Sequence, residues 1–280
     1  MISYLNGTFV DDGKAKVSVR DLGILRGYGV FDVLPISLGK PFLHGKHWNR
    51  LEKSAWELGL HLPVSCEDHR QIICELLEKN DTKNDSVAVR TVLTGGASEG
   101  GSLPENQESF FVVLEPGLRI PLSVHEDGAS VETIEFRREL PSVKSTGYMF
   151  PVRLRVRKQL RNPEAFEIVY MWKGNVLEAS TSNIGMVKDG AVFSPHDGVL
   201  GGVTMMAAMQ LAREAGIPVH GQDISTEEFL GADEVFLTAS NKGIVPVTEI
   251  DGKPVGSGKP GEITKHLREG YEQLVAKGGE

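Results

Sequence analysis

The chain has 280 residues, of which 40% are hydrophobic and 24% charged, as is usual for a globular protein long enough to bury a substantial core. A formal net charge of −8 argues against general binding to nucleic acid or to an anionic membrane, although it is compatible with a local basic pocket for a phosphorylated ligand. The sequence shows no run of 18 apolar residues and no charged-then-apolar leader, so we expect neither a membrane span nor a secretory signal.

The cysteines indicate the redox environment. Cys66 and Cys74 lie in one predicted helix, about two turns apart, which is too far for a disulfide bond. Free thiols predict a reducing, cytoplasmic location. With so few thiols and no paired histidine motif, we expect no metal site.

The first part of the chain mixes strands and helices. Asn6-Gly7 favours a tight hairpin turn, and apolar residues repeat with the 3.6-residue period from Trp48 onward. Such patterns predict a hairpin over 3–10, strands over 16–19, 30–36, 86–94 and 109–114, and helices over 44–58 and 67–79.

In the second part strands dominate. Lys173-Gly174-Asn175 and Lys188-Asp189-Gly190 are turn signals between strand-like runs. We predict strands over 131–136, 167–172, 184–188, 191–194 and 234–238, and helices over 151–161, 203–215 and 262–277. The chain therefore divides into a small α/β domain (1–115), a linker (116–127) and a large mixed α/β domain (128–280), an α+β or α/β two-domain fold.

A lysine in a loop is the first candidate for chemistry. Lys144 lies between a predicted strand and a predicted helix, beside Val143 and Tyr148. Partial desolvation by such neighbours lowers the pKa of a lysine and frees its amine. Read alone, Lys144 also fits an ordinary exposed surface lysine.

A carboxylate and two possible anion-binding loops follow the lysine. Glu178 ends a strand-like run, Gly201-Gly202-Val203-Thr204 opens a predicted helix, and Thr238-Ala239-Ser240 follows a strand. The N–H groups at a helix start bind phosphate, and Arg50 is a candidate cation. Each feature also has an ordinary reading: a solvated glutamate, a glycine hinge with a threonine N-cap, a turn, a solvated arginine. Taken in order with Lys144, the set indicates a site for pyridoxal 5′-phosphate.

The chain resembles the class IV, or fold type IV, pyridoxal-phosphate aminotransferases, which include branched-chain aminotransferases, D-amino acid aminotransferases and aminodeoxychorismate lyases. The resemblance covers essentially the whole chain and rests on Gly27-x-Gly29-Val30-Phe31-Asp32, His47-Trp48-Asn49-Arg50-Leu51, Lys144, Gly174-Asn175-Val176-Leu177-Glu178, Ser182-Asn183, Gly202-Val203-Thr204 and the Ser240 loop. It implies a D-amino acid aminotransferase-like fold and a homodimer.

The resemblance also implies residue roles. Lys144 is expected to join the cofactor covalently and to move the substrate proton, Glu178 to pair with the pyridine nitrogen, and Tyr148 to lie near the cofactor hydroxyl. Phosphate binding is implied for Arg50, Val203, Thr204, Ala239 and Ser240. Ser182 and Asn183 complete the implied cofactor-binding set.

Departures from the branched-chain pattern concern the substrate. Phe31-Asp32-Val33-Leu34-Pro35 lacks the arginine that branched-chain enzymes usually carry, and Met205 stands where arginine is common. Arg26 and Arg90, with Phe31, are the predicted substrate-binding residues, because two cations in one pocket bind one or two carboxylates. The entry Arg26-Gly27-Tyr28-Gly29-Val30-Phe31-Asp32 looks most similar to a less usual group of D-amino acid aminotransferases, although the arginine and histidine pair of the best-known members has no obvious counterpart in Ala97-Ser98-Glu99-Gly100. This resemblance implies a D-amino acid such as D-alanine or D-glutamate, with 2-oxoglutarate or pyruvate as the 2-oxo acid. The alternatives are a branched-chain L-amino acid aminotransferase, an aminodeoxychorismate lyase and, outside the enzymes, a catalytically silent binding protein.

Overall fold

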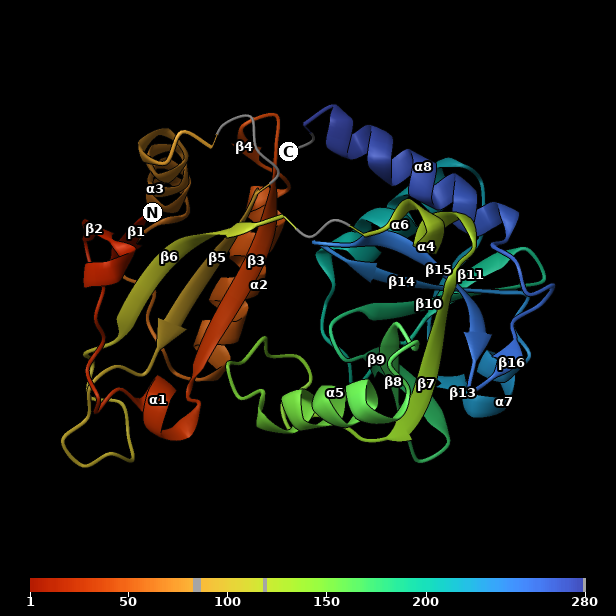
Figure 1. Ribbon diagram of the computed structural model, residues 1–280, viewed down its shortest axis with the longest axis horizontal. Helices are drawn as coiled ribbons and strands as arrows, with labels where there is room; N and C mark the ends of the chain where they lie inside the picture. The colour runs from red at the N-terminus through yellow and green to blue at the C-terminus, as the bar shows by residue number, and fades with distance from the viewer. Residues whose placement is uncertain (83–86, 118–119, 279–280) are drawn as a thin grey trace. The chain divides into compact units, whose positions relative to one another are not determined.

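The structure, a computed structural model, describes residues 1–82, 87–117 and 120–278. Its contacts separate the chain into two compact units, each with helices and a sheet (Figure 1). The first unit comprises residues 1–118, 143–148 and 275–280, and the second comprises 119–142 and 149–274. Within the described residues, no helix is both long and apolar enough to span a membrane.

The segment Val143–Tyr148 packs with the first unit because its backbone bonds to β3 (Gly29–Ser37). Phe31 N donates to Lys144 O at 2.9 Å, and Thr146 N donates to Gly29 O at 2.8 Å. The predicted linker contains the short helix α4 (Leu122–Glu126), while residues 118–119 of that linker lie outside the described part of the chain.

The first unit is built on a sheet with the strand order β2-β1-β6-β5-β3-β4. Its strands are β1 (Ile2–Leu5), β2 (Thr8–Asp11), β3, β4 (Lys40–Pro41), β5 (Val87–Thr94) and β6 (Ser109–Pro116). Its helices are the 3-10 turn η1 (Asp12–Lys14), α1 (Leu22–Arg26), α2 (His44–Glu57) and α3 (Cys66–Lys79). β5 lies between β3 and β6 in antiparallel register, so residues of these three strands share one face at alternate positions.

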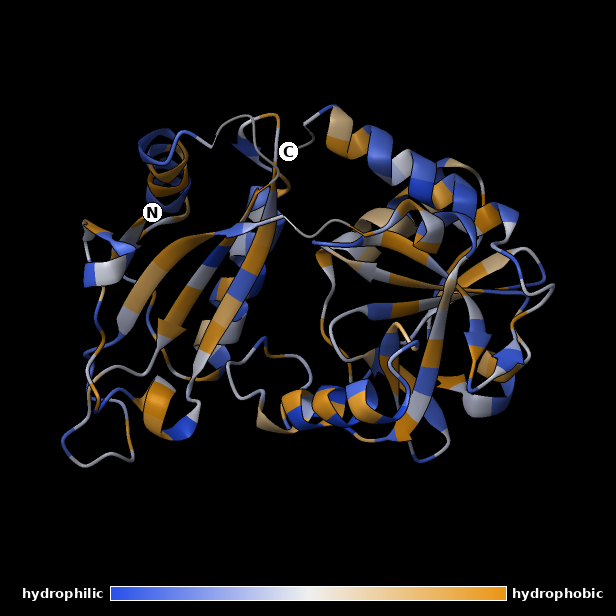
Figure 2. Ribbon diagram, in the orientation of Figure 1, coloured by the Kyte–Doolittle hydropathy of each residue, from blue (hydrophilic) through white to orange (hydrophobic). Residues whose placement is uncertain are grey.

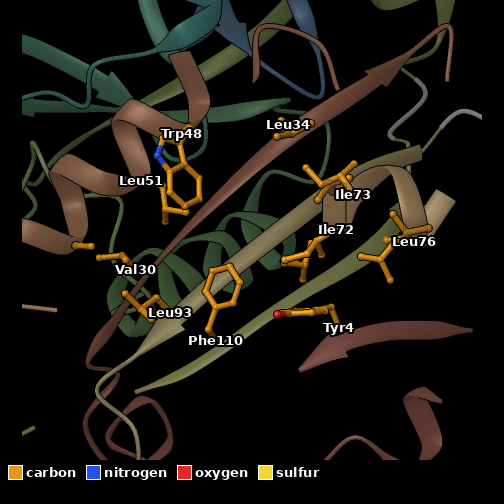
Figure 3. Packing of buried hydrophobic residues seen from close by; sticks show 14 of the residues in the cluster. Tyr4, Val30, Leu34, Trp48, Leu51, Ile72, Ile73, Leu76, Leu93 and Phe110 are labelled. Atoms are coloured by element: carbon orange, nitrogen blue, oxygen red, sulfur yellow. The ribbon is translucent and has the colours of Figure 1, made fainter. Parts of the chain in front are cut away.

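The predicted periodicity places the core of this unit correctly. Trp48 and Leu51 of α2 and Ile73 of α3 are buried against apolar strand residues, among them Val30 and Phe110 (Figure 3). Apolar residues lie along β3, β5 and β6 (Figure 2). Burying each such side chain contributes about 1.5–3 kcal/mol, which is what holds the two helices to the sheet.

The second unit contains a larger sheet, ordered β12-β11-β10-β14-β15-β7-β8-β9-β13, with β16 paired to β15. Its strands are β7 (Ala129–Glu135), β8 (Glu167–Trp172), β9 (Asn175–Ala179), β10 (Asn183–Lys188), β11 (Ala191–Ser194), β12 (Val219–Gly221), β13 (Ile224–Ser225), β14 (Glu234–Ala239), β15 (Gly243–Ile250) and β16 (Lys253–Pro254). A further β9–β10 pairing joins Glu178 to Asn183 and closes the middle strands into a barrel. The helices besides α4 are α5 (Met149–Arg161), α6 (Val203–Glu214), α7 (Thr226–Leu230) and α8 (Glu262–Ala276), the last residues of which belong to the first unit.

Most predicted elements are present, and one is wrong. The predicted strand over 16–19 does not form, because these residues are exposed and pair with no strand among the described residues. Alternation along the chain cannot supply the neighbouring strand that a β-strand requires. The first residue of the strand predicted over 86–94 lies outside the described residues, and β5 is described from Val87.

Candidate active site

Lys144 is held at the edge of the first unit's sheet by its own backbone. Ser145 forms an isolated β-bridge with Val30, next to the bond from Phe31 N to Lys144 O. Lys144 N donates at 3.2 Å to the hydroxyl of Ser54, a buried residue of α2. The lysine therefore sits in a loop, as predicted, but its main chain is fixed between a strand and a helix.

The side chains of Lys144, Arg90 and Tyr148 all lie close to the Phe31 ring. Lys144 Nζ lies 4.8 Å from the ring centroid, and the Arg90 guanidinium lies 5.0 Å from it. The Tyr148 ring meets Phe31 edge to face, with centroids 5.6 Å apart. Arg90 also forms a two-bond ion pair with Glu115, from Nε to Oε1 and from Nη2 to Oε2 at 3.0 Å. Cation–π contact and the ion pair together fix the Arg90 guanidinium beside the Phe31 ring.

Arg26, the second predicted substrate cation, ends α1 in the first unit. It is exposed and donates from Nη1 to Leu25 O at 3.1 Å. This bond ties the side chain to its own helix and does not connect it with Arg90 or Phe31. The role of Arg26 in substrate binding therefore stays a prediction.

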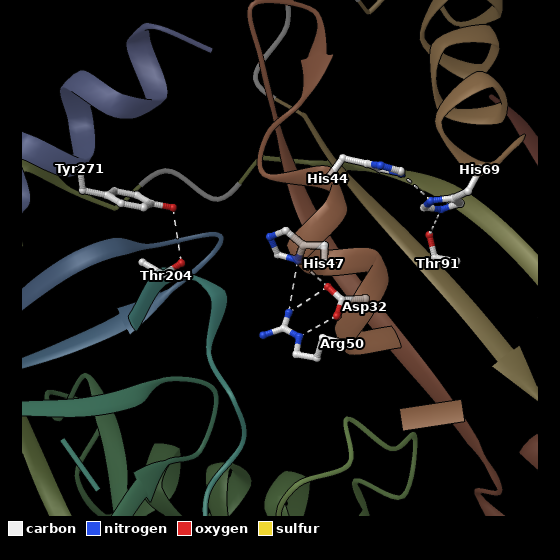
Figure 4. Close-up of polar contacts among 8 residues, drawn as sticks. All are labelled: Asp32, His44, His47, Arg50, His69, Thr91, Thr204 and Tyr271. Carbon is white, nitrogen blue, oxygen red and sulfur yellow. Dashed lines mark hydrogen bonds and ion pairs between the residues drawn. The ribbon is translucent and has the colours of Figure 1, made fainter. Parts of the chain in front are cut away.

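Arg50 is anchored on α2 by Asp32 of β3 (Figure 4). Its Nε donates to Asp32 Oδ2 at 2.7 Å, and its Nη2 donates to Oδ1 at 2.9 Å. His47 Nδ1 lies 2.7 Å from the same Oδ1. Burial acts to raise the pKa of Asp32, but the charge of Arg50 and the contacts of His47 outweigh it and lower that pKa well below its usual range. Asp32 is therefore a carboxylate that fixes Arg50 in one orientation.

Glu178 lies in the second unit, buried at the end of β9. Arg138 Nε donates to its Oε1 at 2.6 Å, and Leu200 N donates to its Oε2 at 3.0 Å. The Arg138 Nη2 also donates to Pro141 O. Both charged side chains are largely shielded, with 13% of Arg138 and 7% of Glu178 exposed. The pairing keeps a carboxylate in a place where an unpaired one is costly.

Helix α6 starts with backbone N–H groups next to a glycine, which has no side chain. Gly202 is the N-cap, and a Cβ there would lie 1.8 Å from Asn183 Oδ1. Asn183 in turn donates from Nδ2 to Leu200 O at 2.7 Å, so it braces the chain that leads into the helix. Val203 and Thr204 are buried in the first turn, and the Thr204 hydroxyl lies 3.4 Å from that of Tyr271 on α8 (Figure 4).

Two tight turns of the second unit complete the predicted cofactor set. Ala239 and Ser240 begin the turn between β14 and β15, where Ala239 pairs with Gly243. Ser182 closes the turn between β9 and β10, and its buried hydroxyl donates to Glu167 at 2.8 Å. The predicted residues of this unit thus occupy strand ends and one helix start, while Lys144, Arg50, Tyr148, Phe31, Arg26 and Arg90 belong to the first unit.

The sequence prediction missed the partners that hold these side chains. Arg138, Asp32, Glu115 and Glu167 each pair with a predicted residue or its neighbour, and none was assigned a role from the sequence. Their signal was weak because charged residues are common on surfaces, and spacing along the chain does not show which ones are buried.

The fold and these groups define a two-unit enzyme of the aminotransferase class, and comparison with known proteins supports this. The Amino-transferase class IV family matches residues 29–250. The putative branched-chain-amino-acid aminotransferase of Methanocaldococcus jannaschii is 34% identical over 99% of this chain and 97% of its own length. The D-alanine aminotransferase of Staphylococcus aureus is 28% identical, with 97% of each chain covered.

A solved structure extends the comparison to the fold. The branched-chain aminotransferase of the archaeon Thermoproteus uzoniensis, solved with norvaline, has a TM-score of 0.90 and 27% identity, and the match covers 100% of this chain and 96% of that one. The chain belongs to the class IV aminotransferase family. The expected fold type, the enzyme class and the pyridoxal-phosphate cofactor are thereby confirmed.

Proposed function

We propose that this aminotransferase moves an amino group between a D-amino acid, such as D-alanine or D-glutamate, and 2-oxoglutarate or pyruvate. The observation that carries the proposal is the shared contact of Lys144 and Arg90 with the Phe31 ring, at 4.8 and 5.0 Å. An amino acid carries its amine and its carboxylate on one carbon atom. Arg90 suits the carboxylate, and the substrate amine would react at the cofactor that Lys144 is proposed to hold. These contacts suit either stereoisomer, and it is the similarity to a D-alanine aminotransferase that supports a D-amino acid as donor.

The residues present fit pyridoxal phosphate by the chemistry of their donors. A phosphate needs N–H donors and a cation: the start of α6 offers N–H groups in the second unit, and Arg50 is a candidate cation in the first. A protonated pyridine nitrogen needs a carboxyl partner, and Glu178 is a buried glutamate paired with Arg138. When bound, the cofactor supplies an aldehyde for an amine and an electron sink for the bond broken at the substrate's α-carbon.

In this proposal each residue of the site has its own role. Lys144 joins the cofactor at rest and, once displaced, holds and returns the proton of the substrate α-carbon at Nζ. Arg90 binds the substrate carboxylate, with Glu115 fixing the plane of its guanidinium. Phe31 and Tyr148 are half-buried and meet edge to face beside the lysine, and Tyr148 keeps its predicted place near the cofactor hydroxyl. Ser182, Asn183, Val203, Thr204, Ala239 and Ser240 retain their predicted roles at the cofactor.

A branched-chain L-amino acid aminotransferase is the second candidate, favoured by a cavity in the first unit. The cavity has a volume of about 220 Å³, and its lining is mostly apolar, with Val17, Ile24, Val92 and Phe111 beside the polar Asp21 and Thr94. Such a wall suits an aliphatic side chain. Thr146, two residues from Lys144, also lines it. The similarity to a putative branched-chain-amino-acid aminotransferase agrees with this candidate.

Half-reactions followed by cofactor absorbance decide between the two. The purified enzyme is mixed separately with D- and L-alanine, D- and L-glutamate and L-leucine. We expect the D-amino acids to convert the cofactor band; conversion by L-leucine alone makes the branched-chain assignment correct instead.

The covalent role of Lys144 has its own test. Borohydride reduction followed by peptide mass mapping should place a pyridoxyl adduct on Lys144, and the Lys144→Ala variant should lose turnover while its thermal unfolding is retained. An adduct on another residue would remove Lys144 from the mechanism. A homodimer and a cytoplasmic location stay predictions, and sedimentation of the purified protein tests the first.

A further inference from the structure

A buried ion pair joins the two turns of the second unit that carry predicted cofactor-binding residues. Glu167 begins β8 and is 3% exposed at its side chain, while Lys242 lies in the β14–β15 turn and is 10% exposed. Their Oε2 and Nζ atoms are 2.7 Å apart. The two residues are 75 positions apart in the chain, so the pair exists only in the folded unit.

Glu167 fills the inside of the β9–β10 turn. Its Oε1 accepts hydrogen bonds from Ser180 Oγ at 3.1 Å, from Thr181 Oγ1 at 2.8 Å and from Thr181 N. Its Oε2 accepts from Ser182 Oγ at 2.8 Å as well as from Lys242. Burial acts to raise the pKa of Glu167, but Lys242 and the hydroxyl donors outweigh it and lower that pKa, so the group is a carboxylate.

Lys242 uses its whole donor capacity within this network. Beyond Glu167, its Nζ donates to Thr181 Oγ1 at 2.6 Å and to Ser182 Oγ at 3.0 Å. An ammonium has three N–H donors, and three acceptors are present. The side chain is therefore saturated inside the protein and is not itself a ligand of phosphate.

The backbone shows what this network fixes. Lys242 N donates to Ala239 O at 3.0 Å, which closes the turn that contains Ser240. Ala179 N donates to Ser182 O at 2.8 Å, which closes the other turn just before Asn183. Each turn is closed by its own bond, and the network around Glu167 and Lys242 links the two.

We propose that Glu167 and Lys242 are positioning residues that hold the Ala239–Ser240 turn in place to bind the cofactor phosphate. The inference rests on the proposed roles of Ala239 and Ser240. Breaking the link lets the β14–β15 turn move relative to the β9–β10 turn, and donors displaced by a fraction of an ångström lose much of their contribution to anion binding.

The test compares two ligands that differ only in phosphate. Apoprotein of the wild type and of Lys242→Met is titrated with pyridoxal phosphate and with pyridoxal, and binding is followed by absorbance. We expect Lys242→Met to raise the Kd of pyridoxal phosphate about tenfold or more and to change that of pyridoxal by less than about threefold. Lys188→Met is the matched control, because Lys188 pairs with Asp233 at 3.1 Å in the same unit but is 43% exposed.

The double variant Glu167→Gln/Lys242→Met is the control for a loss of stability. Removing only one partner of a buried pair leaves an uncompensated charge, whereas removing both charges avoids that penalty. The double variant should keep the thermal unfolding of the wild type and still show the selective loss of pyridoxal phosphate. A folded variant that keeps the wild-type ratio of the two Kd values overturns the inference alone. A wild type that binds pyridoxal phosphate no better than pyridoxal overturns the proposed phosphate site as well.

Discussion

Arg138 and Glu178 form a shielded ion pair in which Arg138 Nε lies 2.6 Å from Glu178 Oε1. The arginine follows β7 and the glutamate lies near the end of β9, 40 positions later. Through its second nitrogen the same guanidinium binds Pro141 O, three residues before Lys144. One side chain thus both pairs with the carboxylate and fixes the path of the chain that approaches the lysine.

Replacing Arg138 by Met should weaken both the fold and the cofactor site. The change leaves the Glu178 carboxylate buried without its cation, which costs about 3–5 kcal/mol of unfolding free energy for a pair of this kind. Urea unfolding of the apoprotein measures the loss, and absorbance titration measures cofactor affinity. Arg155→Met, at an exposed position of α5, is the control. Equal stability of the two variants would show that the pair contributes little.

Gly202→Ala tests the close approach at the start of α6. The new Cβ meets Asn183 Oδ1 at 1.8 Å, so we expect a loss of about 1–3 kcal/mol and weaker binding of pyridoxal phosphate. Gly201→Ala is a matched control, because no atom lies within 4 Å of its added Cβ. Combining Gly202→Ala with Asn183→Ala removes the clash and should restore part of the unfolding free energy. A double variant no more stable than Gly202→Ala would mean that the clash is not the cause.

Arg90 and Arg26 are expected to respond differently to truncation. Arg90→Ala removes the guanidinium over Phe31 and should raise the KM for amino acids about tenfold or more, as loss of a charge-assisted contact does. Arg26 is exposed on α1, and Arg26→Ala should give a smaller rise. Steady-state kinetics with D-alanine and D-glutamate measure both. Unchanged kinetics for both variants would refute the two-arginine hypothesis.

His69 should make the first unit less stable in acid. It is 2% exposed, bonds to Thr91 Oγ1 at 2.7 Å and lies 2.9 Å from His44 (Figure 4). Burial lowers the pKa of His69 from 6.5 to about 3 and that of His44 to about 4. Between these lowered pKa values and pH 6.5, the unfolded chain binds more protons than the folded chain. The free energy of unfolding therefore has its full value above pH 6.5 and declines as the pH falls below 6.5.

The size of this effect follows from the proton linkage. At pH 5 the His69 contribution is lower by about 2 kcal/mol than at pH 7.5. Denaturant unfolding of the apoprotein at both pH values should show a smaller decline in His69→Gln than in the wild type. His61→Gln, whose side chain is 80% exposed, should behave like the wild type. An identical decline in all three proteins would place the acid sensitivity elsewhere.

The sequence was sufficient for features that depend on near neighbours in the chain. The 3.6-residue repeat around Trp48 and Leu51 predicted α2, and Asn6-Gly7 predicted the first hairpin. Burial on one helix face and positive φ in a turn leave a local pattern, so a single stretch shows them. Lys16–Val19 had a strand pattern as well, but a strand also needs a partner, and none pairs with it among the described residues.

The sequence alone predicted the cofactor class, because a lysine, a glutamate and two glycine- or serine-containing loops occur in an order that resembles the class IV aminotransferases. Only the tertiary structure decided which charged side chains form ion pairs at this site. Arg138 meets Glu178 across 40 positions and Lys242 meets Glu167 across 75, because strand order in the barrel brings their β-strands and turns together. Ion pairing acts through space, and a chain of 30 lysines and arginines and 38 acidic residues offers far more possible pairs than the fold allows.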